Sequence, residues 1–283
     1  MNARWLSLSC LALVFACCLA ACSQAPLVSP AITAAQASSQ RGAQAFSKGE
    51  LAIAQREYTT ALRIHESLGD SAGRASSLLS LARIYAQAGR SDDALAAVQE
   101  VLNDPNLAGT ALLITAHGRA AGLLLAKGDV TNAGLQLTRA GVLCGSGCSD
   151  AGALMVLRSR AALLQQQPAL ALKLATEALT LVPAASTPPV RQPQASAERA
   201  NALRVQAQAH AALGQHALAA EPAKAALELD RALGLADRIQ LDLDLLAQTY
   251  SALGVPALSQ QYLTLAERAR AASRDLRSNV SQD

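Results

Sequence analysis

The feature that most constrains this chain is a turn position that recurs about every forty residues. At each occurrence one apolar helical pattern ends and a second one begins. The turn residues are Gly49, Gly89, Gly128, Gln166, Gly214 and Gly254, at spacings of 40, 39, 38, 48 and 40 residues. Glycine readily takes the positive φ that ends a helix. The register therefore predicts a series of helix hairpins, and Gln166 marks the one hairpin without a glycine at its turn.

Small residues return at fixed distances from every turn. Seven residues before the turn stand Gly42, Ala82, Ala121, Ser159, Ala207 and Ala247. Five residues after it stand Ala54, Ala94, Ala133, Ala171, Ala219 and Ser259. Small side chains at these positions let the two helices of a hairpin approach closely. Because one hairpin cannot bury its apolar face alone, we expect neighbouring hairpins to stack.

Composition agrees with a helical chain and argues against several classes of protein. Ala and Leu, which favour helices, are the most frequent residues, whereas aromatic residues make up only 2% of the chain. A β-sandwich, a β-barrel and an aromatic-lined site for sugars or bases are therefore not expected. The net charge of +3 is too small to predict binding to nucleic acid or to an anionic membrane surface.

The register and the residues around it resemble the tetratricopeptide repeat (TPR), in a variety with longer connections than the usual 34-residue unit. The resemblance covers residues 36–272. It implies an all-α fold: an α-solenoid of about six TPR-like helix hairpins, wound into a right-handed superhelix with a concave inner surface.

The N-terminus resembles a bacterial lipoprotein signal peptide. Arg4 precedes the apolar run 5–19, and the run ends in Leu19-Ala20-Ala21-Cys22, which resembles the lipobox. The resemblance implies cleavage of residues 1–21 and attachment of lipid to Cys22. The alternative is an ordinary signal peptide that happens to contain a cysteine.

Lipidation would place the protein in the cell envelope. Two or more acyl chains attach a protein stably to a membrane. Ser23 resembles the pattern that is sorted to the outer membrane, facing the periplasm, if the cell is Gram-negative. Residues 22–35 are expected to form the lipidated cysteine and a flexible tether.

Two further segments interrupt or end the repeats. The proline-rich segment 183–195 is either a hinge after the fourth hairpin or a surface loop. The polar segment 273–283 is expected to be a tail.

Cys144 and Cys148 are separated by Gly-Ser-Gly, between the third and fourth hairpins. Outside the cytoplasm they are expected to form a disulfide. By loop-closure entropy, such a short loop would contribute about 2 kcal/mol. A redox-active pair and half of a metal site are the alternatives, but the spacing is not the two-residue kind typical of either.

Catalytic and cofactor motifs are not found in the sequence. It has no Gly-x-Ser-x-Gly elbow, no phosphate-binding Gly-Lys-Ser/Thr loop and no dinucleotide fingerprint. The four histidines form no His-Glu-x-x-His pattern, and His210 takes a repeat position that usually holds Tyr. We therefore predict a protein that is not an enzyme, with no cofactor and no metal site.

The resemblance to TPR proteins also predicts where a partner binds. Ligands of that family lie against the first helix of each pair, at offsets that the register fixes here. These offsets carry Arg83, Thr115, Arg119, Arg160, Asn201, Arg204, Gln208, Asp244 and Gln248. Arginine suits carboxylates, so the predicted partner is a protein or peptide, with an acidic segment as one possibility. Alternatively, these arginines pair with neighbouring acidic residues or simply solvate the groove.

Three functions compete at this level. The first is a lipid-anchored TPR adaptor or scaffold for a cell-envelope complex, in pilus biogenesis, regulation of peptidoglycan enzymes or outer-membrane assembly. The second is a binder of cell-wall peptide or glycan, and the third is an envelope hydrolase. The sequence favours the adaptor and does not select its partner.

Overall fold

The computed structural model describes residues 29–145, 147–184 and 188–280, with side chains described as far as residue 271. Within these residues the chain forms twelve α-helices, two short 3₁₀ helices and no strand. The predicted signal peptide and Cys22 lie outside the described residues. The helices are α2 (Pro30–Ser47), α3 (Leu51–Ser67), α4 (Ser71–Gln87), α5 (Ser91–Leu102), α6 (Ala111–Ala126), α7 (Val130–Cys144), α8 (Ala151–Leu164), α9 (Pro168–Leu181), α10 (Pro193–Ala212), α11 (His216–Ala232), α12 (Ala236–Ala252) and α13 (Pro256–Val280), with η1 (Pro105–Leu107) and η2 (Pro189–Arg191) between them.

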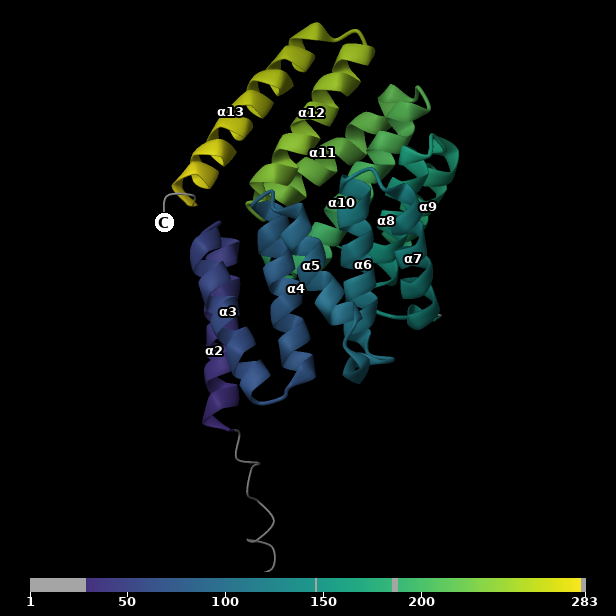
Figure 1. Cartoon of the computed structure of the whole chain (residues 1–283). Coiled ribbons are helices and arrows are strands. Elements are labelled where there is room, and N and C mark those ends of the chain that lie inside the picture. Colours follow the sequence, from purple (N-terminus) through teal and green to yellow (C-terminus); the bar gives the residue numbers. More distant parts are fainter. Residues whose placement is uncertain (1–28, 146, 185–187, 281–283) are drawn as a thin grey trace, which may run out of the picture.

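The helices pair consecutively into six hairpins, from α2–α3 to α12–α13 (Figure 1). In the described part of the chain, the six most extensive helix–helix interfaces are those within these hairpins. Each first helix also packs against the second helix of the hairpin before it. This arrangement confirms the predicted all-α solenoid of helix hairpins.

All six predicted turn residues have positive φ, between 58° and 79°. At every turn, the backbone N–H of the next residue donates to the carbonyl oxygen five residues earlier, over 2.8–3.0 Å. This hydrogen bond is the longer one of the Schellman motif that ends helices. Gln166 is the only non-glycine residue with positive φ in the described part of the chain. The fourth hairpin therefore makes the same turn as the others without a glycine.

The small residues predicted at the helix crossings are buried. Ala54, Ala94, Ala133, Ala171 and Ala219 have no exposed surface. Where serine replaces one of the small residues, its hydroxyl donates to the backbone of the paired helix. Ser159 donates to the Ala171 oxygen over 2.6 Å, and Ser259 donates to the Ala247 oxygen over 2.9 Å. The crossings are thus close enough that a buried hydroxyl finds its partner across the hairpin.

The array is longer at both ends than the sequence predicts. Helix α2 begins at Pro30, six residues before the expected start at residue 36, and α13 continues to Val280, past the expected end at residue 272. Proline fits the first turn of a helix because the N–H that it lacks would have no helical partner there. Pro168 and Pro256 begin α9 and α13 for the same reason. Within the predicted loop 183–195, η2 forms and α10 already starts at Pro193.

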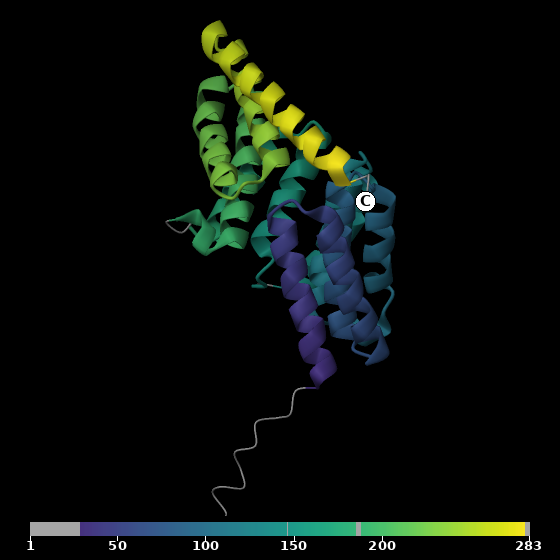
Figure 2. The ribbon, with the colours of Figure 1, turned by 90° about the vertical axis from the view of Figure 1, so that its left-hand side faces the viewer.

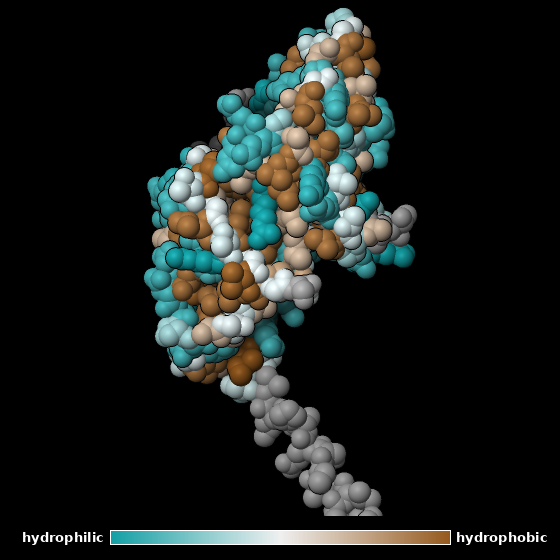
Figure 3. Space-filling model, turned by 90° about the vertical axis from the view of Figure 1, so that its right-hand side faces the viewer, coloured by the Kyte–Doolittle hydropathy of each residue, from teal (hydrophilic) through white to brown (hydrophobic). Residues whose placement is uncertain are grey.

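The array curves back toward its beginning. In both ribbon views the C-terminal end of α13 lies close to the α2–α3 hairpin (Figures 1 and 2). On the side that carries α7 and α9, polar and apolar side chains are interspersed over the surface (Figure 3). Among the described residues, no helix is long and apolar enough to cross a membrane.

Candidate functional site

The predicted partner-binding residues lie on the first helices α4, α6, α8, α10 and α12. We call the face of these helices that carries them the first-helix surface. Burial is the main cause that lowers the pKa of Arg83, Arg119 and Arg160. The charge of Arg83 also lowers the pKa of Arg119, and that of Arg204 lowers the pKa of Arg160. Arg83 and Arg119 therefore lie close enough to repel one another, and so do Arg160 and Arg204.

Arg238, at the start of α12, connects the two ends of this surface. Burial lowers its pKa most, and the charges of both Arg204 and Arg83 lower it further. Arg83 is in the second hairpin and Arg238 is in the sixth, so the curvature of the array brings the two together. The offsets used for the sequence prediction lie 6 to 13 residues before each turn, so they did not include Arg238, which lies 16 residues before Gly254.

Arg119 and Arg160 have no hydrogen bond or ion pair with any described residue. The Nε of Arg119 is buried without a partner. Desolvation, together with repulsion from Arg83, lowers the pKa of Arg119 to about 10, although Asp150 acts in the opposite direction. Both guanidinium groups are still cationic at neutral pH, and both are partly removed from water. Such groups are suited to bind an anion because much of the cost of desolvation has already been met in folding.

Arg83 lies against an aromatic ring. Its Cζ is 4.6 Å from the ring centroid of Phe46 on α2, a cation–π contact that holds the guanidinium in place. The ring of Tyr58 on α3 packs on Gly42, where a Cβ would come within 2.9 Å of the ring carbons. The Tyr58 hydroxyl lies within electrostatic range of both Arg83 and Arg119.

Arg204 differs from the other predicted arginines because it is buried and fully paired. Its Nε donates to Asp242 Oδ1 over 2.6 Å and its Nη2 to Asp242 Oδ2 over 3.1 Å. Nη2 also bonds Asp230, and Nη1 donates to Asn201 Oδ1 over 2.8 Å. Neither aspartate side chain has any exposed surface. Arg204 therefore joins α10, α11 and α12 and is not open to a partner, which corrects the sequence prediction for this residue, whereas Asn201 is partly exposed.

Of the remaining predicted residues, some are bonded to neighbouring side chains and others are exposed. Asp244 is paired with Arg270 on α13, whereas Gln208 is partly exposed and Gln248 is exposed. The hydroxyl of Thr115 donates to Asp150 Oδ2 over 2.8 Å. Asp150 precedes α8, so this bond links the third and fourth hairpins.

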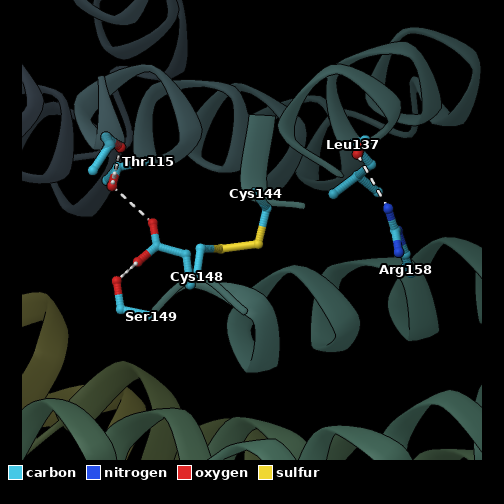
Figure 4. The surroundings of a disulfide bond; sticks show 8 residues. Thr115, Leu137, Cys144, Cys148, Ser149 and Arg158 are labelled. Carbon is cyan, nitrogen blue, oxygen red and sulfur yellow. Dashed lines mark hydrogen bonds between the residues drawn. A yellow bond between two sulfur atoms is a disulfide. The ribbon is translucent and has the colours of Figure 1, made fainter. Parts of the chain in front are cut away.

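A disulfide between Cys144 and Cys148 bridges the loop between α7 and α8, just before Asp150 (Figure 4). Ser149 donates to Asp150 Oδ1 over 3.3 Å, and the N–H of Ala151 donates to the Cys148 carbonyl oxygen over 3.2 Å. The disulfide thus lies two residues from the one carboxylate that partly offsets the charge of Arg119.

The described residues contain no group of three or more His, Cys, Asp or Glu side chains placed to hold a metal ion. His65, His117 and His210 each form a hydrogen bond with a nearby side chain. A shallow groove of about 390 Å³ lies between α5 and the α6–α7 hairpin, lined mainly by Leu, Ala and Val side chains with three amides. None of these features resembles a catalytic centre.

Comparison with known proteins identifies the repeat. Residues 33–104, which span the first two hairpins, match the family model of the tetratricopeptide repeat. The other four hairpins have the same turn and the same crossing. The first two hairpins are thus tetratricopeptide repeats, and the described array as a whole has the TPR fold. No curated protein matches it.

Two solved structures match this chain at low identity. The crystal structure of MamA protein is 13% identical over 86% of this chain and 94% of that one, with a TM-score of 0.34. The crystal structure of BtubC (BKLC) from P. vanneervenii is 16% identical over 87% of this chain and 93% of that one, with a TM-score of 0.44. At these TM-scores the likeness adds nothing to the fold described above. The TPR fold itself is in general a scaffold for protein–protein interaction.

Proposed function

We propose that this TPR protein is a lipid-anchored adaptor that binds a protein or peptide partner on its first-helix surface. It would support the assembly or regulation of a cell-envelope complex from the outer membrane, facing the periplasm. The pathway, whether pilus biogenesis, control of peptidoglycan enzymes or outer-membrane assembly, depends on the partner.

The observation that supports the proposal is the pair of unpaired guanidinium groups of Arg119 and Arg160. Both belong to first helices of successive hairpins, and neither bonds another described residue. Leaving a buried or half-buried charge without a partner costs stability. A partner that supplies anionic groups would recover that cost on binding. The alternative functions, a binder of cell-wall glycan and an envelope hydrolase, have no comparable support on this surface.

The binding surface can be tested by photocrosslinking in intact cells. A photoreactive amino acid at Gln208, which is partly exposed on the same surface, is expected to yield a defined crosslinked protein. The same amino acid at Arg139, on the exposed side of α7, is the control and is expected to yield none. The double variant Arg119→Glu, Arg160→Glu should abolish the product at Gln208 and keep the helical circular dichroism signal. An unchanged product in that variant would reject the surface.

The anchor and the absence of catalysis are tested separately. Radiolabelled palmitate should attach to the protein and should not attach to the Cys22→Ser variant, which should leave the membrane fraction. Zymography of the purified protein on peptidoglycan should show no cleared band. A cleared band would favour the hydrolase, and unlabelled protein would exclude the anchor.

A further inference from the structure

The unpaired arginines of the first-helix surface carry an inference about the chemistry of the partner, which rests on the proposed function. Arg83, Arg119 and Arg160 belong to α4, α6 and α8. These helices are consecutive first helices, and α4 contacts α6 as α6 contacts α8. The three arginines therefore lie on neighbouring first helices, one on each of three successive hairpins, and we call them the arginine row.

The chain neutralises this row only weakly. Asp150 is the one carboxylate whose charge acts on Arg119, and its Oδ2 already accepts from Thr115. In contrast, Arg204 is satisfied by two aspartates and an asparagine. Beyond Arg204, the exposed positions of α10 and α12 carry the uncharged Gln208 and Gln248. Among the predicted binding residues, the arginines without an ion pair are thus those of α4, α6 and α8, and several anionic groups are needed to balance them.

The spacing of the helices limits how those groups are arranged. Helices in contact lie about 8–10 Å apart. A polyproline II segment has three residues per turn and rises about 3.1 Å per residue, so every third side chain projects from the same side at intervals of about 9 Å. A run of adjacent acidic residues places its carboxylates too close together to reach three helices.

We propose that Arg83, Arg119 and Arg160 bind an extended, polyproline II-like acidic segment whose carboxylates stand at every third residue. One carboxylate lies on each guanidinium, as planar forks allow. The carboxylate at Arg119 meets the most desolvated of the three guanidinium groups. The Tyr58 hydroxyl, near Arg83 and Arg119, is a further donor at this point.

The test uses fluorescence anisotropy with the mature protein and synthetic peptides. The probe is Glu-Pro-Ala repeated three times. The comparison peptides are one with the same composition and three adjacent Glu residues, and one with Gln in place of Glu. The spaced peptide is expected to bind about tenfold more tightly than the block peptide, and the Gln peptide is expected not to bind. Equal affinity of the spaced and block peptides would overturn the proposed spacing.

Variants connect the binding to the named residues. Arg119→Gln should weaken the spaced peptide about tenfold, and Arg119→Lys should not restore the affinity, since an ammonium lacks the planar fork. Arg139→Gln, on the exposed side of α7, is the matched control and should change nothing. Tighter binding of inorganic polyphosphate than of the spaced peptide would overturn a peptide ligand. If the acidic peptides do not bind but crosslinking at Gln208 still captures a protein, this inference fails and the adaptor function stands.

Discussion

The two halves of the first-helix surface both carry arginines, but in opposite surroundings. In the fifth and sixth hairpins, Arg204 is buried between Asp230 and Asp242 and joins three helices. In the third and fourth hairpins, Arg119 and Arg160 are half-buried and have no bond to any described residue. The difference arises from the neighbours, because α11 and α12 place carboxylates within hydrogen-bond distance of Arg204, whereas Asp150 acts on Arg119 without bonding it. Whether an arginine on a first helix is paired or left unpaired therefore depends on whether the neighbouring helices place a carboxylate within hydrogen-bond distance.

The first prediction, with the largest effect, concerns the paired half. Arg204→Met leaves two buried aspartates without their cation, and it should lower the free energy of unfolding by about 3–5 kcal/mol. Urea unfolding followed by circular dichroism at 222 nm measures this change.

A second variant separates loss of the ion pair from loss of packing. Replacing Asp230 and Asp242 by Leu together with Arg204→Met removes all the buried charges and should regain most of the lost stability. If Arg204→Met costs no more than a surface substitution, the cluster does not hold α10, α11 and α12 together.

The second prediction uses the pH dependence of the same cluster. Desolvation raises the pKa of Asp230 to about 6, and the neighbouring Asp242 adds to the rise, although Arg204 and Arg238 oppose it. Between about pH 4 and pH 6 the folded chain thus binds more protons than the unfolded one, so this group's contribution to stability falls as the pH rises. Relative to Asp230→Asn, the unsubstituted protein should lose on the order of 1–2 kcal/mol from pH 4.5 to pH 7.5.

Chemical unfolding of both proteins at the two pH values measures this difference. Comparing each protein with the other at the same pH removes the contribution of carboxylates with lowered pKa, such as Asp70, which act in the opposite direction. A difference that does not change with pH would show that Asp230 is as ionised in the folded state as in the unfolded one.

The third prediction, with the smallest effect, concerns the unpaired half. Arg160→Met and Arg119→Met each remove a desolvated cation that bonds nothing in the described chain. Each should therefore change the free energy of unfolding by less than about 1 kcal/mol, in either direction. Thermal unfolding of the two variants beside Arg204→Met gives the direct contrast. A loss as large as that of Arg204→Met would mean that these arginines, too, hold the array together.

The repeat register was readable because it depends on local chemistry. A helix end with positive φ favours glycine, and a close helix crossing requires a small residue. Both requirements therefore appear in the sequence as residue types at fixed spacing. The prediction extended even to Gln166, which was placed by its position in the register and takes the same turn with φ of 58°. The ends of the array were predicted less accurately. The prolines near residue 30 suggest a flexible tether, but Pro30 is the first residue of α2.

The site was predictable only in part. The repeat offsets placed Arg83, Arg119 and Arg160 on one surface, but they also selected Arg204 and missed Arg238. The carboxylates of Asp230 and Asp242 lie 26 and 38 residues after Arg204. No local pattern relates residues at such distances, so their pairing could not be derived from the offsets.

The sequence by itself determined the helix hairpins, their six turns and the small residues at their crossings, since each depends on backbone geometry within one hairpin. Only the tertiary structure decided which arginines are neutralised and which are left unpaired among the described residues. Charge compensation acts through space, and the curvature that brings the second hairpin near the sixth exists only once all the hairpins are stacked.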